Sequence, residues 1–168
     1  FRLVDWKDEG AMVQSPAVAI LIQHPTLGNI LYDTGNCEDF SAVYTEEMLH
    51  DYPITEMISI QEALAQKGLT PDDIDLIILS HLHFDHAGGL KHFVGTKAIR
   101  RVLVSEADLK NAYWSVMTGN GGAYIRSLFD VEGIQFQTIR ETTKLAEDLE
   151  LFIQASHTPG VIGMVLKT

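Results

Sequence analysis

The stretch "DIDLIILS", residues 73–80, constrains the fold more than any other part of the sequence, because its apolar run has no polar alternation. A strand that faces water on one side alternates apolar and polar residues, whereas a strand covered on both faces can be apolar throughout. The stretch therefore predicts a central strand with packed layers on both sides. Further apolar runs predict strands at residues 17–23, 29–32, 98–104, 134–139, 149–155 and 161–166.

Helix signals stand between these strands, which indicates an α/β fold built in layers. In "SIQEALAQKGLTP", Ser59 and Glu62 have the spacing of a capping box, and Gly68 follows the last turn. Ile60 and Leu64 recur at helical spacing and are expected to face the core.

A second helix is predicted to run from its N-cap, Ser105, to about Trp114. Asp108 stands three residues after Ser105, at the position from which a carboxylate returns to the N-cap amide in a capping box. The loop "MTGNGGAY", which is rich in glycine, follows this helix.

Length and charge bound the classes of function. The 168 residues are enough for one domain, expected over 1–168. The net charge of -11 argues against nucleic acid and anionic membranes as partners. The longest apolar run, residues 17–22, is far shorter than the ~20 residues of a membrane helix. The lone Cys37 fits a reducing compartment, so a cytoplasmic location is expected, although the chain opens on Phe1 and sequence is expected upstream.

Histidines gather directly after the central strand and after the strand at 149–155. His81 and His83 are two residues apart, so in extended backbone they share a face and can point at one metal ion. Asp85 and His86 can face a second ion if the chain turns into a helix there. His157 follows the later strand, where a loop can bring it to the same place. Imidazole and carboxylate without thiolate favour a catalytic site for zinc, iron or a similar ion.

Three motifs carry a resemblance to a known family. "SHLHFDHAGG" matches the HxHxDH signature of the metallo-β-lactamase superfamily, and "DTG" (33–35) and "HTPG" (157–160) stand in the order that this superfamily uses. The wording of the first motif is most similar to the N-acyl homoserine lactonase branch. The resemblance covers nearly all of the chain. It implies an αββα sandwich of two similar halves, of which this chain would supply about the N-terminal half to two-thirds.

The resemblance also implies two divalent metal ions, first of all zinc, with iron, manganese or cobalt as alternatives. The ligands that it implies are His81, His83 and His157 for the first ion, and Asp85 and His86 for the second. Asp33 would orient a ligand through a hydrogen bond; its alternative role is that of a turn residue.

The activity that the resemblance implies is hydrolysis of a small-molecule lactone, similar to an N-acyl homoserine lactone, by attack of a metal-bound hydroxide. Asp85 would pass a proton to the leaving oxygen. A thioester hydrolase of the glyoxalase II type, or another hydrolase of the superfamily, remains open as an alternative. A single-iron persulfide dioxygenase would need only the first site. From another class, the chain could be a fragment that binds metal without turnover.

The family pattern also needs a bridging aspartate and a last histidine after "HTPG", and the 168 residues supply neither. His24, His50 and His92 are expected to be surface or core-edge residues rather than substitutes. The second site is therefore expected to be incomplete on this chain. A longer parent protein is expected, and the alternative is a self-standing half that pairs with a second copy as a homodimer. A fragment without the missing ligands is expected to show little hydrolysis.

Overall fold

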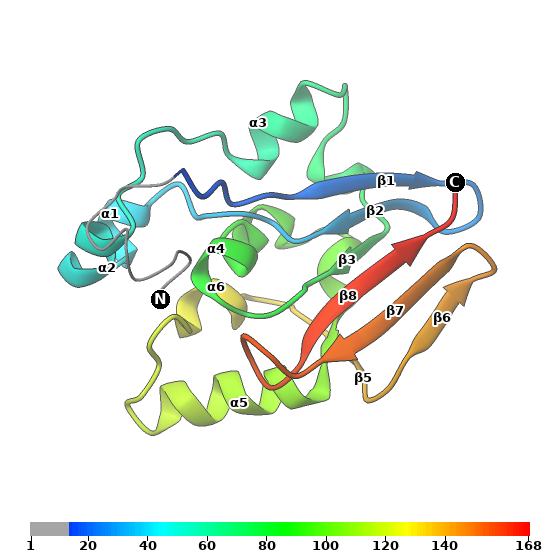
Figure 1. Ribbon diagram of the computed structural model, residues 1–168. Helices are drawn as coiled ribbons and strands as arrows, with labels where there is room; N and C mark the ends of the chain where they lie inside the picture. The colour runs from blue at the N-terminus through cyan, green and yellow to red at the C-terminus, as the bar shows by residue number, and fades with distance from the viewer. Residues whose placement is uncertain (1–13) are drawn as a thin grey trace.

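A computed structural model of the chain describes residues 14–168, and two β-sheets form its centre (Figure 1). The strands are β1 (Ile20–His24), β2 (Gly28–Tyr32), β3 (Leu76–Ile78), β4 (Val102–Ser105), β5 (Phe136–Ile139), β6 (Thr143–Ala146), β7 (Leu149–Gln154) and β8 (Val161–Leu166). One sheet has the order β1-β2-β3-β4-β5, and the other has the order β6-β7-β8. The two sheets pack face to face.

The helices are mostly short. The α-helices are α1 (Phe40–Val43), α2 (Glu46–Asp51), α3 (Ile60–Ala65), α4 (Phe84–Ala87), α5 (Glu106–Met117) and α6 (Arg126–Phe129). The 3₁₀ helices are η2 (Pro71–Asp73), η3 (Leu90–Phe93) and η4 (Ala98–Arg100). The capping box of α3 is confirmed, because Glu62 N donates to Ser59 Oγ and Ser59 N donates to Glu62 Oε2.

The five-stranded sheet combines a hairpin with parallel strands. β1 and β2 pair antiparallel as predicted, and β2, β3, β4 and β5 then pair parallel in sequence. All three residues of β3 are buried, which confirms a central strand that is covered on both faces. The strand is shorter than the predicted 73–80, because η2 precedes it and the loop that carries the predicted ligands begins soon after it.

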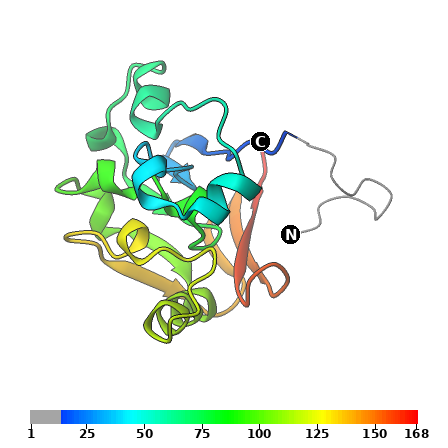
Figure 2. The same ribbon diagram turned by 90° about the vertical axis from the view of Figure 1, so that its left-hand side faces the viewer.

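Two apolar clusters separate three layers. One lies between the five-stranded sheet and the helices and includes Phe93 and Phe129. The other lies between the two sheets and includes Ile78, Leu103 and Ile162. Figure 2 shows the helices on one side of the five-stranded sheet and the β6-β7-β8 sheet on the other. Among residues 14–168, no helix covers the outer face of the β6-β7-β8 sheet (Figures 1 and 2).

The predicted strands need two corrections: one begins too early, and one strand is missing. Residues 98–100 form η4 rather than the start of a strand, and β4 begins only at Val102, where pairing with β5 starts. The strand β6 was not predicted at all, since "TKLA" is neither a long apolar run nor a clear alternation. β6 forms because its backbone pairs with β7.

Hydrogen bonds tie the two sheets to each other at both ends of the sandwich. At one end Ile162 N, on β8, donates to Ser80 O, just after β3, at 2.8 Å. At the other end His24 Nε2, on β1, lies 3.0 Å from Asp148 Oδ1 in the β6-β7 turn.

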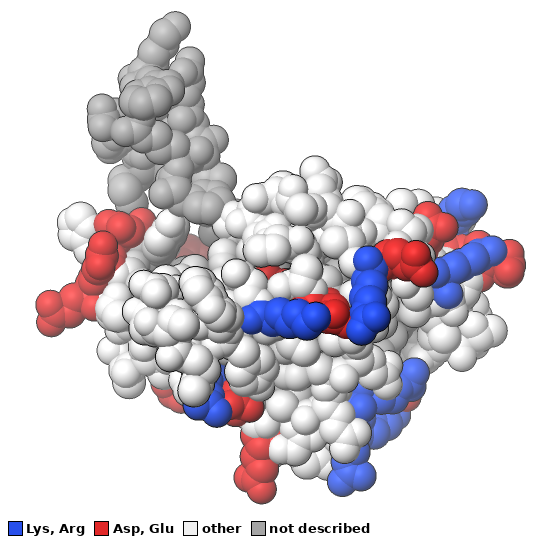
Figure 3. Space-filling model, turned by 90° about the horizontal axis from the view of Figure 1, so that it is seen from below, with Lys and Arg blue, Asp and Glu red and all other residues white. Residues whose placement is uncertain are grey.

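The surface carries both signs of charge. Figure 3 shows Lys and Arg interspersed with Asp and Glu on the face seen from below, without a continuous field of one sign. No helix within residues 14–168 is long and apolar enough to cross a membrane.

Candidate metal centre

The centre lies at the carboxyl ends of neighbouring parallel strands. Tyr32 of β2 pairs with Ile78 of β3, so the residues that follow the two strands emerge side by side. Asp33 N donates to Ile78 O at 2.8 Å, which places "DTG" against the start of "SHLHFDHAGG". Loops at the carboxyl ends of parallel strands are the usual ligand sites of α/β folds.

Three of the predicted ligands come together. One ligand atom from each of His81, His83 and His157 lies within 4.8 Å of the other two. His157 Nε2 is 3.1 Å from His83 Nδ1, across 74 residues of chain. His81 and His83 belong to the loop after β3, and His157 belongs to the loop between β7 and β8. This proximity is the arrangement that the sequence predicted, and the metal-binding role of the three residues stays a prediction.

The hydrogen bonds of Ser80 determine which nitrogen of His81 faces the cluster. Ser80 Oγ donates to Asp33 Oδ2 at 2.7 Å and lies 3.0 Å from His81 Nδ1. Because the serine proton is used on Asp33, the His81 Nδ1–H donates to Ser80, and Nε2 carries the lone pair. Among the described residues, His81 Nε2 is the one buried side-chain nitrogen or oxygen with no hydrogen-bond partner.

Burial keeps these imidazoles neutral in the metal-free protein. Desolvation lowers the pKa of His81 to about 2 and that of His83 to about 4. Partial desolvation also lowers the pKa of the more exposed His157. Neutral imidazole is the form that binds a metal ion.

A metal ion fits these residues. A buried nitrogen lone pair that accepts no hydrogen bond destabilises a protein, and a bound cation would satisfy it. Two nitrogens that bind one tetrahedral zinc at ~2.0–2.1 Å lie about 3.3 Å apart. The 3.1 Å between His83 Nδ1 and His157 Nε2 is close to that separation.

Asp85 and His86 lie beside the three-histidine group rather than within it. Both are on α4, so the helical turn that the sequence interpretation required for them is present, and His86 Nε2 lies 3.4 Å from Asp85 Oδ2. His86 Nδ1 is 2.8 Å from Asp33 Oδ2. Burial opposes a charge on His86, but its hydrogen bonds to Asp33 and Asp85 dominate and raise its pKa to about 10. The second ion and its two ligands therefore stay a prediction.

The remaining histidines lie away from the centre. His24 is buried, and its Nδ1 accepts from Thr26 N and Leu27 N in the β1-β2 turn. The His50 side chain is 87% exposed. His92, on η3, lies 3.4 Å from Glu38 Oε2.

The sequence interpretation missed three polar residues around the centre: Ser80, Asp108 and Tyr124. Ser80 could have been found from its place between the buried strand and His81. Asp108 was assigned only to a capping box, but its carboxylate does not return to the Ser105 amide, and that half of the prediction was wrong. Ser105 Oγ does accept from Asp108 N, at 3.0 Å. Tyr124 carries no local signal, because it stands at the end of a glycine-rich loop.

Comparison with known proteins assigns the chain to a family. The family model described as Metallo-beta-lactamase superfamily matches residues 13–168. The chain belongs to the metallo-beta-lactamase superfamily. An N-acyl homoserine lactonase from Bacillus sp is 28% identical to this superfamily member in an alignment 167 positions long that covers 95% of the chain.

Solved structures agree with the fold of this metallo-beta-lactamase superfamily chain. An N-acyl homoserine lactone hydrolase with the product N-hexanoyl-L-homoserine bound at its catalytic metal center matches with a TM-score of 0.69 and 27% identity. A mutant of AiiA from B. thuringiensis with N-decanoyl-L-homoserine bound at its active site matches with a TM-score of 0.70 and 26% identity. Each match covers 89% of this chain and 58% of the other chain. The predicted metallo-β-lactamase-like fold is confirmed.

The chain is shorter than these relatives. It spans 61% of the length of the lactonase from Bacillus sp, which falls within the predicted half to two-thirds.

Proposed function

We propose that the protein is a metal-dependent hydrolase that opens the ring of an N-acyl homoserine lactone. The observation that carries the proposal is the convergence of His81, His83 and His157 on one point, with an unpartnered buried nitrogen on His81. The lactone as substrate is supported by the relatives, because the similar hydrolase holds N-hexanoyl-L-homoserine at its catalytic metal center.

We assign the first ion, most simply zinc, to His81, His83 and His157, and the second to Asp85 and His86. When bound, the ions supply Lewis acidity and lower the pKa of water toward ~7. Asp33 orients His86, and through Ser80 it also orients His81.

The proton transfers fall to Asp85. In the metal-free protein, burial raises the pKa of this carboxyl, but the hydrogen bond with His86 and the charge of His86 prevail and leave the pKa lowered. An ionised Asp85 can take up the proton that water loses as it attacks the lactone carbonyl. It then passes that proton to the ring oxygen as the carbon–oxygen bond breaks, and the product is the open hydroxy acid.

The first experiment measures ring opening of N-hexanoyl homoserine lactone by protein loaded with zinc, with the product identified by its mass gain of one water. His83→Ala is expected to abolish turnover, whereas His50→Ala, which changes an exposed histidine outside the three-histidine group, is expected to leave it unchanged. Hydrolysis of a small acyl thioester but not of the lactone would overturn the substrate. Hydrolysis of neither would leave a metal-binding protein without turnover.

A metal count per chain, on a sample whose intact mass is known, tests the two-ion assignment independently of activity. Two ions per chain are expected where all the ligands are present. One ion that is lost in His83→Ala but retained in Asp85→Asn would mean that only the three-histidine site forms. No bound metal after purification without chelator would contradict the whole assignment.

A further inference from the structure

The first turn of α5 holds a carboxylate that the proposed reaction does not use. Asp108 is fully buried, at 0% exposure, three residues after the N-cap Ser105. Its backbone amide donates to Ser105 Oγ, but its side chain points out of the helix. Oδ2 accepts from Leu82 N at 2.8 Å, and Oδ1 accepts from the Tyr124 hydroxyl at 2.6 Å. Burial raises the pKa of this carboxyl, and the neighbouring Thr158 side chain partly offsets the rise.

Each partner of Asp108 belongs to, or touches, a segment that carries one of the three histidines. Leu82 stands between His81 and His83, and Thr158 directly follows His157. The ring of Tyr124 packs edge-on against the ring of His83, with the centroids 4.5 Å apart. One carboxylate therefore reaches the backbone or the neighbours of all three predicted ligands.

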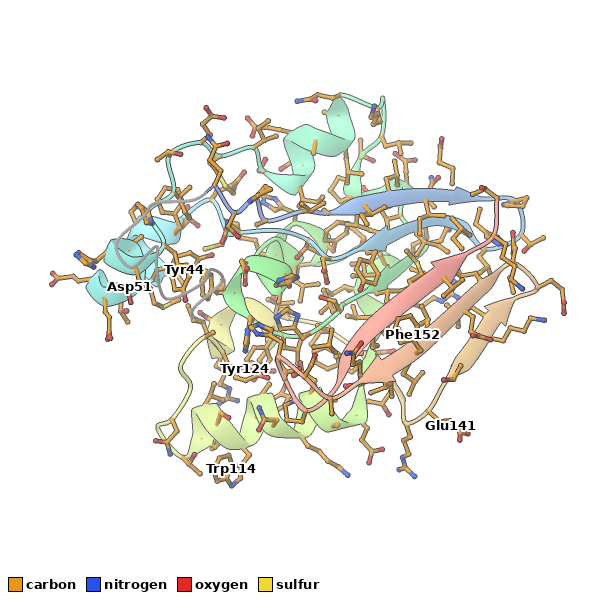
Figure 4. All side chains as sticks on the ribbon, in the orientation of Figure 1. Tyr44, Asp51, Trp114, Tyr124, Glu141 and Phe152 are labelled. Atoms are coloured by element: carbon orange, nitrogen blue, oxygen red, sulfur yellow. The ribbon has the colours of Figure 1, made fainter. Side chains whose placement is uncertain are left out.

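A second contact joins the loop that carries His157 to the first turn of α5. Ser105 Oγ donates to Gly160 O at 2.5 Å. A Cβ on Gly160 would lie only 2.1 Å from Ser105 Oγ, so no larger residue fits without a shift. The loop "HTPG" is thus fixed to the start of α5 at Gly160, with Thr158 beside the Asp108 carboxyl. Figure 4 shows Tyr124 between α5 and α4, where it bridges Asp108 and His83.

The alternative explanation is that Asp108 only caps and anchors α5. A cap needs one bond to a helix amide, and Ser105 already makes that bond. The carboxylate instead accepts from Leu82 N and from the Tyr124 hydroxyl, both outside the helix, and a buried carboxylate is retained only where such donors satisfy it. These two donors and the neighbouring Thr158 lie on three separate segments whose shared feature is the histidine cluster.

We propose that Asp108, together with Tyr124, is a positioning residue that holds His81, His83 and His157 at the spacing that one metal ion needs. This inference rests on the metal site of the proposed function. It does not depend on the lactone being the substrate.

The test compares two tyrosines that make the same type of bond. Tyr124→Phe removes the hydroxyl that donates to Asp108 and keeps the ring beside His83. Tyr113→Phe is the matched control. Tyr113 lies on α5, as Asp108 does, and its hydroxyl donates to Asp130 at 3.0 Å rather than to Asp108. Asp108→Asn is the second variant. The readouts are zinc affinity by competition with a chromogenic chelator, the visible spectrum of bound Co²⁺, and thermal unfolding of the metal-free protein.

Tyr124→Phe is expected to weaken zinc binding about 10-fold or more and to alter the Co²⁺ spectrum, in the range that neighbours of metal ligands usually show. Asp108→Asn is expected to do the same more strongly, and Tyr113→Phe is expected to change neither readout. If Asp108→Asn does not fold, Tyr124→Phe decides alone.

Unchanged affinity and spectrum in Tyr124→Phe, with any loss of thermal stability matched by Tyr113→Phe, would reduce Asp108 to a structural residue and overturn the inference. If the wild-type protein binds zinc but opens no lactone, and Tyr124→Phe weakens zinc binding as expected, the proposed function is overturned and this inference stands.

Discussion

Asp33 and His86 lie 53 residues apart in the sequence, and 2.8 Å separates Asp33 Oδ2 from His86 Nδ1. Asp33 reaches this position with a φ of 60°, and among the described residues it is the one non-glycine residue with positive φ. This conformation is uncommon, although Asp adopts it more readily than bulky residues do. It persists here because Ser80 N donates to Oδ1, while Ser80 Oγ and His86 Nδ1 both bond to Oδ2.

Replacing Asp33 by Asn keeps the side-chain size and the tolerance for positive φ, but it removes the negative charge. In metal-free protein we expect the pKa of His86 to fall from about 10, because the bond to Asp33 is the strongest influence that opposes burial. We also expect about a 10-fold to 100-fold loss of affinity for the second ion. NMR titration of the imidazole and a chelator competition measure the two effects. Asp51→Asn, beside the exposed His50, is the control, and a His86 pKa unmoved in Asp33→Asn would contradict the prediction.

In the metal-free protein, the free energy of unfolding is predicted to depend on pH in two ranges: an acid flank due to His81 and His83, and an alkaline flank due to His86. The folded pKa values of His81 and His83, about 2 and about 4, lie below the ordinary 6.5 because of burial. The unfolded chain therefore binds more protons below about pH 6.5, and the free energy of unfolding falls as the pH falls. His86 is the opposite case: its contribution is fully present below 6.5 and is lost as the pH rises through about 10.

Denaturant unfolding in the presence of chelator, repeated across this range, measures the two flanks. His83→Gln is expected to flatten the acid flank, and Asp33→Asn is expected to flatten the alkaline flank. Flanks that keep their slopes in both variants would show that other groups determine the pH dependence.

Gly88→Ala is predicted to destabilise the fold by about 1–3 kcal/mol, because overpacking against backbone cannot relax easily. A Cβ at Gly88 would lie 2.4 Å from Cys37 N and 2.6 Å from Phe84 O. Gly163→Ala is the comparison: there the three atoms nearest to the new Cβ all belong to the ring of Phe152, which is half-buried on the sheet's outer face (labelled in Figure 4). This ring can rotate away, so a smaller loss is expected. Chemical denaturation of both variants measures the difference, and equal losses would contradict the argument.

His24→Ala is predicted to lower stability by about 1–3 kcal/mol without changing metal affinity. The substitution leaves Thr26 N and Leu27 N without their acceptor, and it breaks the link from Nε2 to Asp148. Asp148→Ala is expected to matter less, since its side chain is 41% exposed and water replaces the lost partner. Thermal melts with and without zinc separate the two properties. A loss of zinc affinity in His24→Ala would mean that this end of the sandwich also shapes the centre.

The sequence predicted well what local chemistry determines. The capping box of Ser59 and Glu62 forms within one helix turn, and the apolar residues of β3 can only be satisfied between two layers. The histidine motifs were predicted to meet because each follows a strand, and the structure brings His81, His83 and His157 together.

What the sequence did not predict depends on partners that are distant along the chain. Nothing local in "TKLA" indicates β6, which exists through its pairing with β7. Asp108 has the spacing of a capping residue, yet its carboxylate accepts hydrogen bonds from Leu82 N and the Tyr124 hydroxyl instead of from the Ser105 amide. The local pattern could not reveal these donors, because Tyr124 lies on another loop and Leu82 on another strand end.

The closeness of His83 and His157 has a consequence for the connectivity of the chain. The two residues are 74 positions apart, and their loops leave different sheets. An ion held by both would close the intervening segment into a ring, as a disulfide does, and would restrict the unfolded chain as much as it organises the folded one. With an ion bound, the centre would therefore also be a removable cross-link between the sheets, and the affinity for the ion would be linked to the stability of the sandwich.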